Sequence, residues 1–328
     1  RVKPDICAKG SGVYSTVSNG SLYATYNGTS MSCPNVSGIL PQLYDAYRQN
    51  NNNQWANSAL MKAIILNTAE DLGNPGPDYK FGWGRINALR AARVIEDKSY
   101  FQSSVQTGII QQHQITVPAN VAQLRVMVYW HDQVAAVGAA KALVNDINMS
   151  ISTPGGGSIQ PWVLNPTPDP NLLDQPAVRG NDTLNNVEQV TSDNPSAGQY
   201  TILVEGKTIP QGPQTYFAVY EFVYAEVDIT YPIGNESWVP NETEIIRWDA
   251  GGDNGTFAIE WSSDSGSTWL PIASGLSASA RQYTWQVPST TTGQALMRVI
   301  RGTDTARVKA PFSIIDVPNN VRVLWSCG

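Results

Sequence analysis

A short stretch near the start of the chain places a serine hydroxyl where acyl-transfer chemistry needs one. It covers residues 28–38, GTSMSCPNVSG. This stretch predicts a tight turn and then a helix, because Thr29 and Ser30 can accept hydrogen bonds from the first N–H groups and Pro34 lies early enough to be tolerated. The helix dipole and the unpaired N–H groups favour negative charge beside Ser30. We therefore predict Ser30 as a nucleophile, although such a serine is also a common helix cap.

The same stretch resembles the nucleophile signature of subtilisin-like serine proteases, G-T-S-M-[AS]-x-P-x-V-x-G. Further segments resemble this family in the same order along the chain: residues 3–8, 12–16, 59–69 and 81–88. The resemblance implies that residues 1–98 are the C-terminal third of a subtilisin-type α/β catalytic domain. It also implies peptide-bond hydrolysis by Ser30, with Thr29 and the Ser30 N–H in the surroundings of the oxyanion.

A serine nucleophile needs a general base, normally a histidine that a carboxylate orients. The resemblance places the family's His and Asp, and an Asn that binds the oxyanion, well before the serine. The chain has only two histidines, His113 and His131, and neither fits that position. His131 and Asp132 are adjacent, and adjacent residues on a strand point to opposite faces. We expect both histidines at the surface or at strand ends, and a chain that begins inside the catalytic domain.

Composition limits the class of protein. The 328 residues suggest two or three domains, and the net charge of −6 with 15% charged residues provides no basic surface for nucleic acid. No apolar run reaches the length of a membrane span. Abundant Trp, Tyr, Gly and Pro are typical of an extracellular β-rich protein. The resemblances to secreted subtilases and, in the last β-rich segment, to modules of bacterial surface proteins imply a secreted or bacterial cell-surface location.

The chain has three cysteines, Cys7, Cys33 and Cys327. An odd count cannot pair completely, so we predict free thiols rather than a disulfide framework. Cys33 follows the proposed nucleophile on the apolar side of its helix, where we expect a small buried thiol.

Three helices are predicted in residues 1–98. The first runs over residues 30–48 with an apolar stripe, and Pro41 in its interior predicts a kink or a break. The second covers residues 58–68 with Ser58 as its N-cap, and the third begins after Asn87 and ends near residue 97. In the family such helices pack on a parallel sheet that is mostly absent here. We therefore expect this region to associate with another chain or to adopt a shifted packing.

Residues 99–226 contain strand after strand, and we predict a jelly-roll β-sandwich like the C-terminal β-domain of some secreted subtilases. Leu124, Val126, Val128 and Trp130 alternate with less apolar residues, which predicts a half-buried strand. Loops rich in Asp and Asn could hold Ca²⁺ through hard oxygens, although such residues more often form turns. The candidate ligands are Asp132, Asp146, Asp182 and Glu188; no cofactor is required by the proposed chemistry.

Residues 227–316 are predicted as an immunoglobulin-like β-sandwich of short strands. Trp248, Trp261 and Trp285 suit its core, whereas exposed tryptophans would bind carbohydrate. Residues 264–266 predict a hairpin turn. Residues 317–328 are expected to be a linker or the start of another module.

Two hypotheses of function follow. In the first, the chain is part of a secreted subtilisin-like serine endopeptidase that acts on proteins or peptides and is inactive alone. Its His and Asp would come from the rest of the catalytic domain or from a second copy. In the second, the chain is a non-catalytic array of β-modules for surface attachment or for binding substrate or carbohydrate.

Overall fold

The computed structural model describes residues 1–18, 22–252 and 255–316. The chain forms two compact units, Arg1–Val223 and Tyr224–Gly328. Each unit has its own hydrophobic core. Within the described residues, the helices belong to the first unit, whereas the second consists of β-strands and loops.

The first unit begins with a short hairpin and three helices. The hairpin pairs β1 (Val13–Thr16) with β2 (Tyr23–Tyr26) in antiparallel register. The helices are α1 (Thr29–Asn50), α2 (Ser58–Asn67) and α3 (Ala88–Glu96). All three lie within about two residues of the predicted ranges, which confirms the helical part of the sequence pattern.

Two four-stranded sheets follow in the first unit. One has the order β10-β5-β12-β3 and the other β4-β11-β6-β7, and a two-stranded ribbon pairs β8 with β9. The elements are β3 (Tyr100–Val105), β4 (Ile110–Val117), β5 (Val121–Tyr129), β6 (Asp146–Ser152), β7 (Ser158–Ile159), β8 (Trp162–Val163), α4 (Pro170–Leu173), β9 (Val178–Arg179), β10 (Val187–Asp193), β11 (Gly198–Thr208) and β12 (Gln214–Tyr224).

The two four-stranded sheets share one hydrophobic core. It takes Val126 and Val128 from β5, Ile147 from β6 and Ile202 from β11, so side chains of both sheets interdigitate. Trp130, just after β5, is completely buried and donates its indole N–H to the Asn145 carbonyl at 3.0 Å. This part of the chain is therefore β-rich, as the alternation predicted; the jelly-roll assignment stays a prediction.

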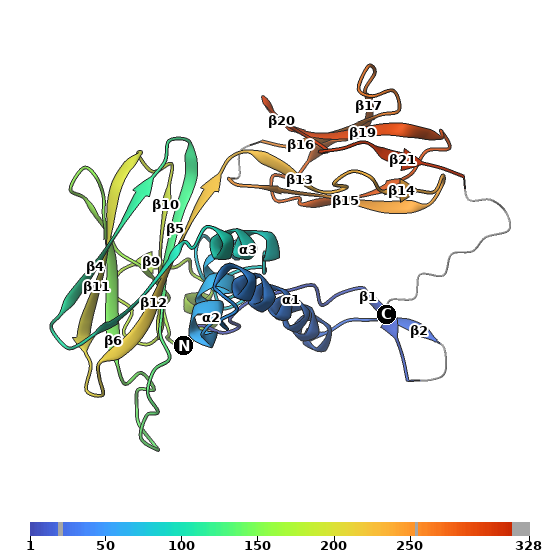
Figure 1. Ribbon diagram of the computed structural model, residues 1–328. Coiled ribbons are helices and arrows are strands. Elements are labelled where there is room, and N and C mark those ends of the chain that lie inside the picture. Colours follow the sequence, from blue (N-terminus) through green and yellow to red (C-terminus); the bar gives the residue numbers. More distant parts are fainter. Residues whose placement is uncertain (19–21, 253–254, 317–328) are drawn as a thin grey trace. The chain divides into compact units, whose positions relative to one another are not determined.

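The outer face of the β10-β5-β12-β3 sheet is covered by helices. Figure 1 shows α2 and α3 beside this sheet. Met127 and Tyr129 of β5 join Ile64 of α2 and Ile95 of α3 in a second core. The prediction that β5 is half-buried is therefore wrong, because the helices exclude water from the face opposite the sandwich core. We expected these helices to lack the parallel sheet on which they pack in the family. For α2 and α3, the β10-β5-β12-β3 sheet provides a packing surface instead.

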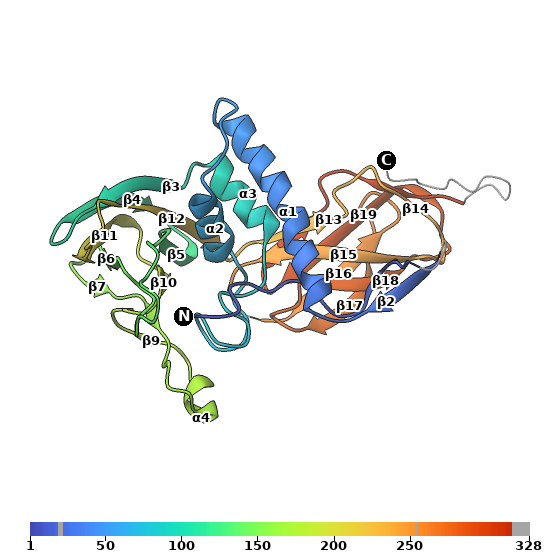
Figure 2. The same cartoon turned by 90° about the horizontal axis from the view of Figure 1, so that it is seen from below.

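Helix α1 contributes less to this second core. It contacts α3 along its C-terminal half, where Leu43 is buried and Tyr47 is partly buried (Figure 2). Its N-terminal half, from Thr29 to Gln42, is exposed or only partly buried. The helix continues through Pro34 and Pro41, so the predicted break at Pro41 does not occur.

Asparagines cap the two shorter helices. The Asn57 side chain accepts from the Ala59 N–H at 2.8 Å, and Asn87 accepts from the Arg90 N–H at 3.0 Å. The assignment of Ser58 as the cap is thus wrong by one residue, whereas the predicted start of the third helix directly after Asn87 is confirmed. Both asparagines pair a donor that the helix itself leaves free.

The second unit is built from β-strands in two sheets. A three-stranded sheet has the order β13-β15-β18, and a larger sheet runs β14-β21-β19-β16-β17 with β20 paired to β19. The strands are β13 (Val227–Tyr231), β14 (Ser237–Trp238), β15 (Thr243–Ala250), β16 (Phe257–Ser262), β17 (Leu270–Leu276), β18 (Gln282–Gln286), β19 (Thr292–Arg301), β20 (Asp304–Arg307) and β21 (Phe312–Ile314).

Tryptophans fill the core of the second unit. Trp248, Trp261 and Trp285 are all buried, which confirms their predicted place and removes them as carbohydrate-binding surfaces. Asp264 organises the turn after β16, where its carboxylate accepts from the Thr268 N–H at 2.9 Å and from two hydroxyls. The immunoglobulin-like assignment stays a prediction, and the linker predicted for residues 317–328 lies outside the described residues.

Candidate active site

Ser30 is exposed at the N-terminus of α1, as its second residue. The preceding Gly28 has φ 151° and ψ 168°, a conformation that residues with a Cβ rarely adopt. The Gly28 N–H donates to the Gly10 carbonyl at 2.7 Å, and a Cβ on Gly10 would lie 2.8 Å from the Gly28 oxygen. Two glycines thus let the chain segments approach and fix the turn that presents Ser30.

The start of α1 leaves backbone donors free. The Met31 and Ser32 N–H groups donate to the Gly28 carbonyl at 3.1 and 3.4 Å, whereas the Thr29 and Ser30 N–H groups have no partner among the described residues. Within the described ranges no side chain caps this end, so the prediction that the Thr29 and Ser30 hydroxyls accept from these groups is wrong. The free donors remain available to an anion beside Ser30.

Neither histidine serves Ser30 in the described structure. His113 lies on β4, where its Nε2 is 2.7 Å from the Tyr216 hydroxyl and its ring stacks on Phe101 at 4.7 Å. Partial burial lowers the pKa of His113. His131 is exposed just after β5 and packs edge-on against Tyr129. Among the described residues, no hydrogen bond joins either ring to Ser30. His131 lies at the surface beyond a strand end, as expected, whereas His113 lies within β4 and is half-buried, so the expectation is wrong for His113.

The thiols lie at two places in the first unit. Cys7 is partly buried with its Sγ 3.4 Å from the Phe81 carbonyl, and burial raises its pKa, helped by Asp78. Cys33 is exposed, so the prediction of a buried thiol is wrong, because this half of α1 has little packed against it. Both are free thiols as predicted, whereas Cys327 lies outside the described residues.

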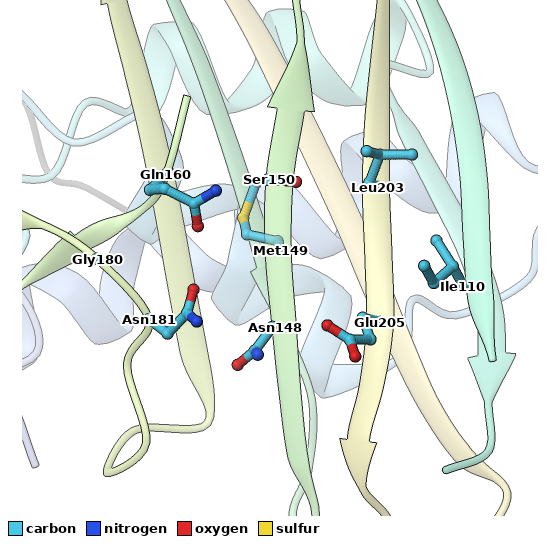
Figure 3. Close-up of a pocket in the computed structure, with 9 residues that line it drawn as sticks. All are labelled: Ile110, Asn148, Met149, Ser150, Gln160, Gly180, Asn181, Leu203 and Glu205. Atoms are coloured by element: carbon cyan, nitrogen blue, oxygen red, sulfur yellow. The ribbon is translucent and has the colours of Figure 1, made fainter. Parts of the chain in front are cut away.

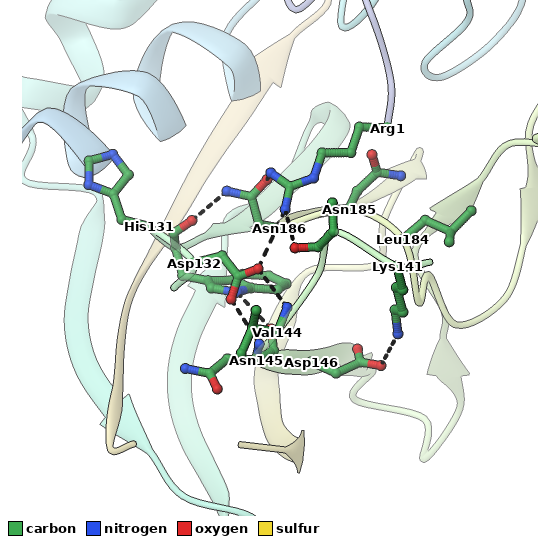
Figure 4. Close-up of polar contacts among 12 residues, drawn as sticks. Arg1, His131, Asp132, Lys141, Val144, Asn145, Asp146, Leu184, Asn185 and Asn186 are labelled. Atoms are coloured by element: carbon green, nitrogen blue, oxygen red, sulfur yellow. Dashed lines mark hydrogen bonds and ion pairs between the residues drawn. The ribbon is translucent and has the colours of Figure 1, made fainter. Parts of the chain in front are cut away.

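The four candidate calcium ligands lie at four places: Asp132 just after β5, Asp146 at the start of β6, Asp182 in the loop before β10 and Glu188 on β10. The Asp132 carboxylate accepts from the Val144 and Asn145 N–H groups, both at 2.8 Å, and contacts Arg1 at 3.4 Å (Figure 4). Asp182 accepts from the Leu184 N–H at 2.8 Å and from the Asn185 amide at 2.6 Å. These two carboxylates therefore act as turn-formers, the alternative that the sequence left open.

Asp146 and Glu188 have oxygens without partners. Asp146 Oδ2 is 3.2 Å from Lys141, and Glu188 Oε2 accepts from the Met149 N–H at 2.6 Å. Asp146 Oδ1 and Glu188 Oε1 are buried and have no hydrogen-bond partner among the residues that the structure describes. Burial raises the pKa of Glu188 well above its usual range, and the nearby Asp182 and Asp146 charges add to the rise. Among the described residues there is no group of three acidic, His or Cys side chains placed to hold a metal.

The sequence did not single out Gly10 as part of the Ser30 turn. Gly10 lies eighteen positions before Gly28, and the contact between them is a backbone approach across a hairpin. No local pattern marks such an approach. The presence of glycine on both sides is the signal that could have suggested it.

A family model of proteases matches the part of the chain that carries Ser30, and individual proteases match segments of similar length. Residues 1–84 match the model of the subtilase family, peptidase S8. Alkaline elastase YaB from Bacillus sp. (strain YaB) is 42% identical over 89 residues, 27% of this chain and 21% of the relative. Thermitase from Thermoactinomyces vulgaris is 35% identical over 89 residues, 27% of this chain and 28% of the relative.

An extracellular serine protease from Serratia marcescens is 37% identical over 65 residues, 20% of this chain and 6% of the relative. The chain thus spans less than a third of the length of these three relatives. The crystal structure of Bacillus licheniformis lipase BlEst2 aligns with 64% of this chain and 39% of its own at 9% identity and a TM-score of 0.22, too low to bear on the fold. Over residues 1–84 the chain is similar to subtilases, and Ser30 lies within that segment.

Proposed function

We propose that this chain is part of a subtilisin-like serine endopeptidase in which Ser30 attacks the scissile carbonyl. The observation that carries the proposal is the exposed Ser30 at an uncapped helix N-terminus, inside the segment that matches subtilases. The Thr29 and Ser30 N–H groups are free to donate to the oxyanion that forms in the tetrahedral intermediate. The substrates are proteins or peptides.

No residue in contact with Ser30 in the described structure can act as its general base. Both histidines of the chain have other surroundings, so the remaining catalytic residues belong to another polypeptide segment or to a second copy. The exposed N-terminal half of α1 is the surface at which such a segment would dock. Without it, the chain has at most feeble activity.

Since one relative is named an extracellular protease, we also propose secretion or a cell-surface location. Within the described ranges, none of the helices combines the length and the apolar character of a membrane span.

A fluorophosphonate probe with peptide mass mapping tests this proposal. We expect labelling at Ser30 wherever peptidase activity is present, and loss of both in Ser30→Ala. Ser37→Ala is the matched control, because Ser37 is an exposed serine on the same helix and lies away from the turn. Peptidase activity that survives in Ser30→Ala, or labelling that maps to another serine, would disprove the role of Ser30. A folded chain that stays unlabelled until a second segment is added would assign the base to that segment.

We further propose that Ca²⁺ binds beside Asp146 and Glu188. Because no third acidic side chain of the described residues joins them, backbone carbonyls and waters would supply the rest of the about six to eight oxygen ligands. The unpaired buried oxygens of Asp146 and Glu188 are hard ligands of the type that Ca²⁺ prefers, and a cation would remove the cost of leaving them unpaired. We expect calcium to raise the melting temperature of the chain relative to a chelator, and to raise it less in Glu188→Gln. Equal melting temperatures with calcium and with chelator would contradict the proposal.

A further inference from the structure

A cavity of about 400 Å³ lies on the outer face of the β4-β11-β6 sheet (Figure 3). Its floor is a row of residues that face one another across three strands: Ile110 on β4, Glu205 on β11 and Asn148 on β6. Leu203 and Ser150 form the next row. Because residues opposite one another on adjacent strands are close neighbours, these side chains form one continuous surface.

One wall of the cavity comes from the connection between β7 and β10. Gln160, Gly180 and Asn181 line it, and Asn181 and Gln160 project toward the sheet (Figure 3). This connection shields the floor, so that Asn148 is only 8% exposed although its strand position faces outward. The outward face is therefore a walled site and not a flat sheet surface.

The buried amide of Asn148 points to a ligand. Its Oδ1 has no hydrogen-bond partner in the described structure and is inaccessible, which is costly for an acceptor in the folded protein. Figure 3 shows the side chain directed into the cavity, toward Asn181. Because Oδ1 has almost no accessible surface in this structure, a bound molecule that donates a hydrogen bond would satisfy it after a small rotation of the amide toward the cavity.

The lining defines the chemistry of that molecule. Three side-chain amides, one carboxylate and one hydroxyl offer both donors and acceptors within a small space. None of the nine lining residues is Lys, Arg or His, and the nearby Lys207 is paired with Glu205 at 3.8 Å. With a net charge of −6 on the chain, an anionic ligand is disfavoured. Leu203 and Ile110 add an aliphatic surface.

We propose that this cavity binds a neutral oligosaccharide. Vicinal hydroxyls donate and accept at neighbouring positions, as the amides and the Glu205 carboxylate require, and the C–H face of a sugar ring matches Leu203 and Ile110. The volume suits a ligand of one or two sugar rings. This binding is independent of Ser30, and it goes beyond the proposed peptidase activity.

An extended peptide fits less well. Peptides that add to a sheet use the free backbone groups of an edge strand, whereas the floor of this cavity is a sheet face. On β11 the backbone groups already pair with β4 on one side and β6 on the other. Recognition on the floor therefore comes from side chains, which suits a polyhydroxylated ligand. Since, among the described residues, β6 pairs with β7 only at Ile151 and Ser152, a peptide along the rest of that edge is the alternative that the test below must exclude.

The test is a binding screen of the whole 328-residue chain against cellotetraose, mannotetraose and N-acetylchitotetraose, with sulfated sugars and peptides as comparisons. We expect saturation-transfer NMR and calorimetry to detect at least one neutral sugar and no sulfated sugar. Glu205→Gln and Asn181→Ala should each weaken binding by about tenfold, since each removes one strong hydrogen bond. Both residues are partly or fully exposed, so these variants keep the fold, which circular dichroism verifies.

Gln199→Ala is the matched control, because Gln199 is an exposed amide on the same strand, paired with Gln114 and outside the cavity. It should bind like the wild type. Binding of none of the neutral sugars, binding of peptides only, or equal effects of the Gln199 and cavity variants would overturn the proposal. Because all measurements are repeated in Ser30→Ala, failure of the peptidase proposal would not affect the result.

Discussion

The single residue Asp132 holds together the two ends of the connection between β5 and β6. Its side chain is 3% exposed and accepts two backbone N–H groups at 2.8 Å. In Asp132→Ala these donors lose a charged acceptor, so we expect the free energy of unfolding to fall by about 2–4 kcal/mol in urea titrations. Lys207→Ala, which removes an exposed ion pair with Glu205, should cost less than about 1 kcal/mol. Equal losses in both variants would show that the clamp is unimportant.

Glu188 predicts a pH dependence of stability. Burial raises its pKa in the folded state, and the unfolded value is about 4.3. The folded state therefore binds the proton more tightly, so the stability from this group is fully present below about pH 4 and is lost as the pH rises toward the folded pKa. Without calcium, Glu188→Gln should flatten this loss in denaturation curves measured from about pH 4 to pH 8. A variant with the same pH profile as the wild type would contradict the assignment.

The packing of α2 on β5 gives a prediction at the scale of an element. Ile64 is completely buried between the helix and the sheet, whereas Leu89 of α3 is 37% exposed. We expect Ile64→Ala to lower the free energy of unfolding by about 2–5 kcal/mol and Leu89→Ala by clearly less. Chemical denaturation measures both. A small effect at Ile64 would mean that α2 is not fixed on the sheet.

The pattern of apolar residues predicted where most helices and strands lie. It did not predict which elements pack against one another. Helical spacing in residues 30–48 and alternation around Leu124 identified α1 and β5, because both periods are local properties. The burial of Met127 and Tyr129 depends on helices that lie tens of residues earlier in the chain. Nothing near β5 encodes that contact, so the prediction of a half-buried strand failed.

The candidate site was predictable to a similar degree. The turn before α1 identified Ser30, since its signature is a short contiguous stretch. The cavity around Asn148 and Glu205 was not predicted, because its residues come from three strands and a connection whose register the sequence does not show.

At the scale of the molecule, the two compact units predict independent stability. Tyr224 begins a unit with its own core of tryptophans and aliphatic residues. We expect residues 224–316 expressed alone to fold cooperatively, with the blue-shifted fluorescence of buried Trp248, Trp261 and Trp285. The whole chain should show a transition at the same temperature. A segment that is unfolded when alone would mean that its stability depends on the first unit.

The helical layer on the β10-β5-β12-β3 sheet also determines when the first unit can fold during synthesis. Helices α2 and α3 leave the ribosome first, but their core is completed by Phe217 and Val219 of β12. Until that strand emerges, the apolar faces of both helices stay open to solvent, and a nascent chain in this state is prone to aggregation. Synthesis of the first unit thus includes a long interval in which chaperones have a binding surface, and ribosomes that stall before β12 would release an insoluble product.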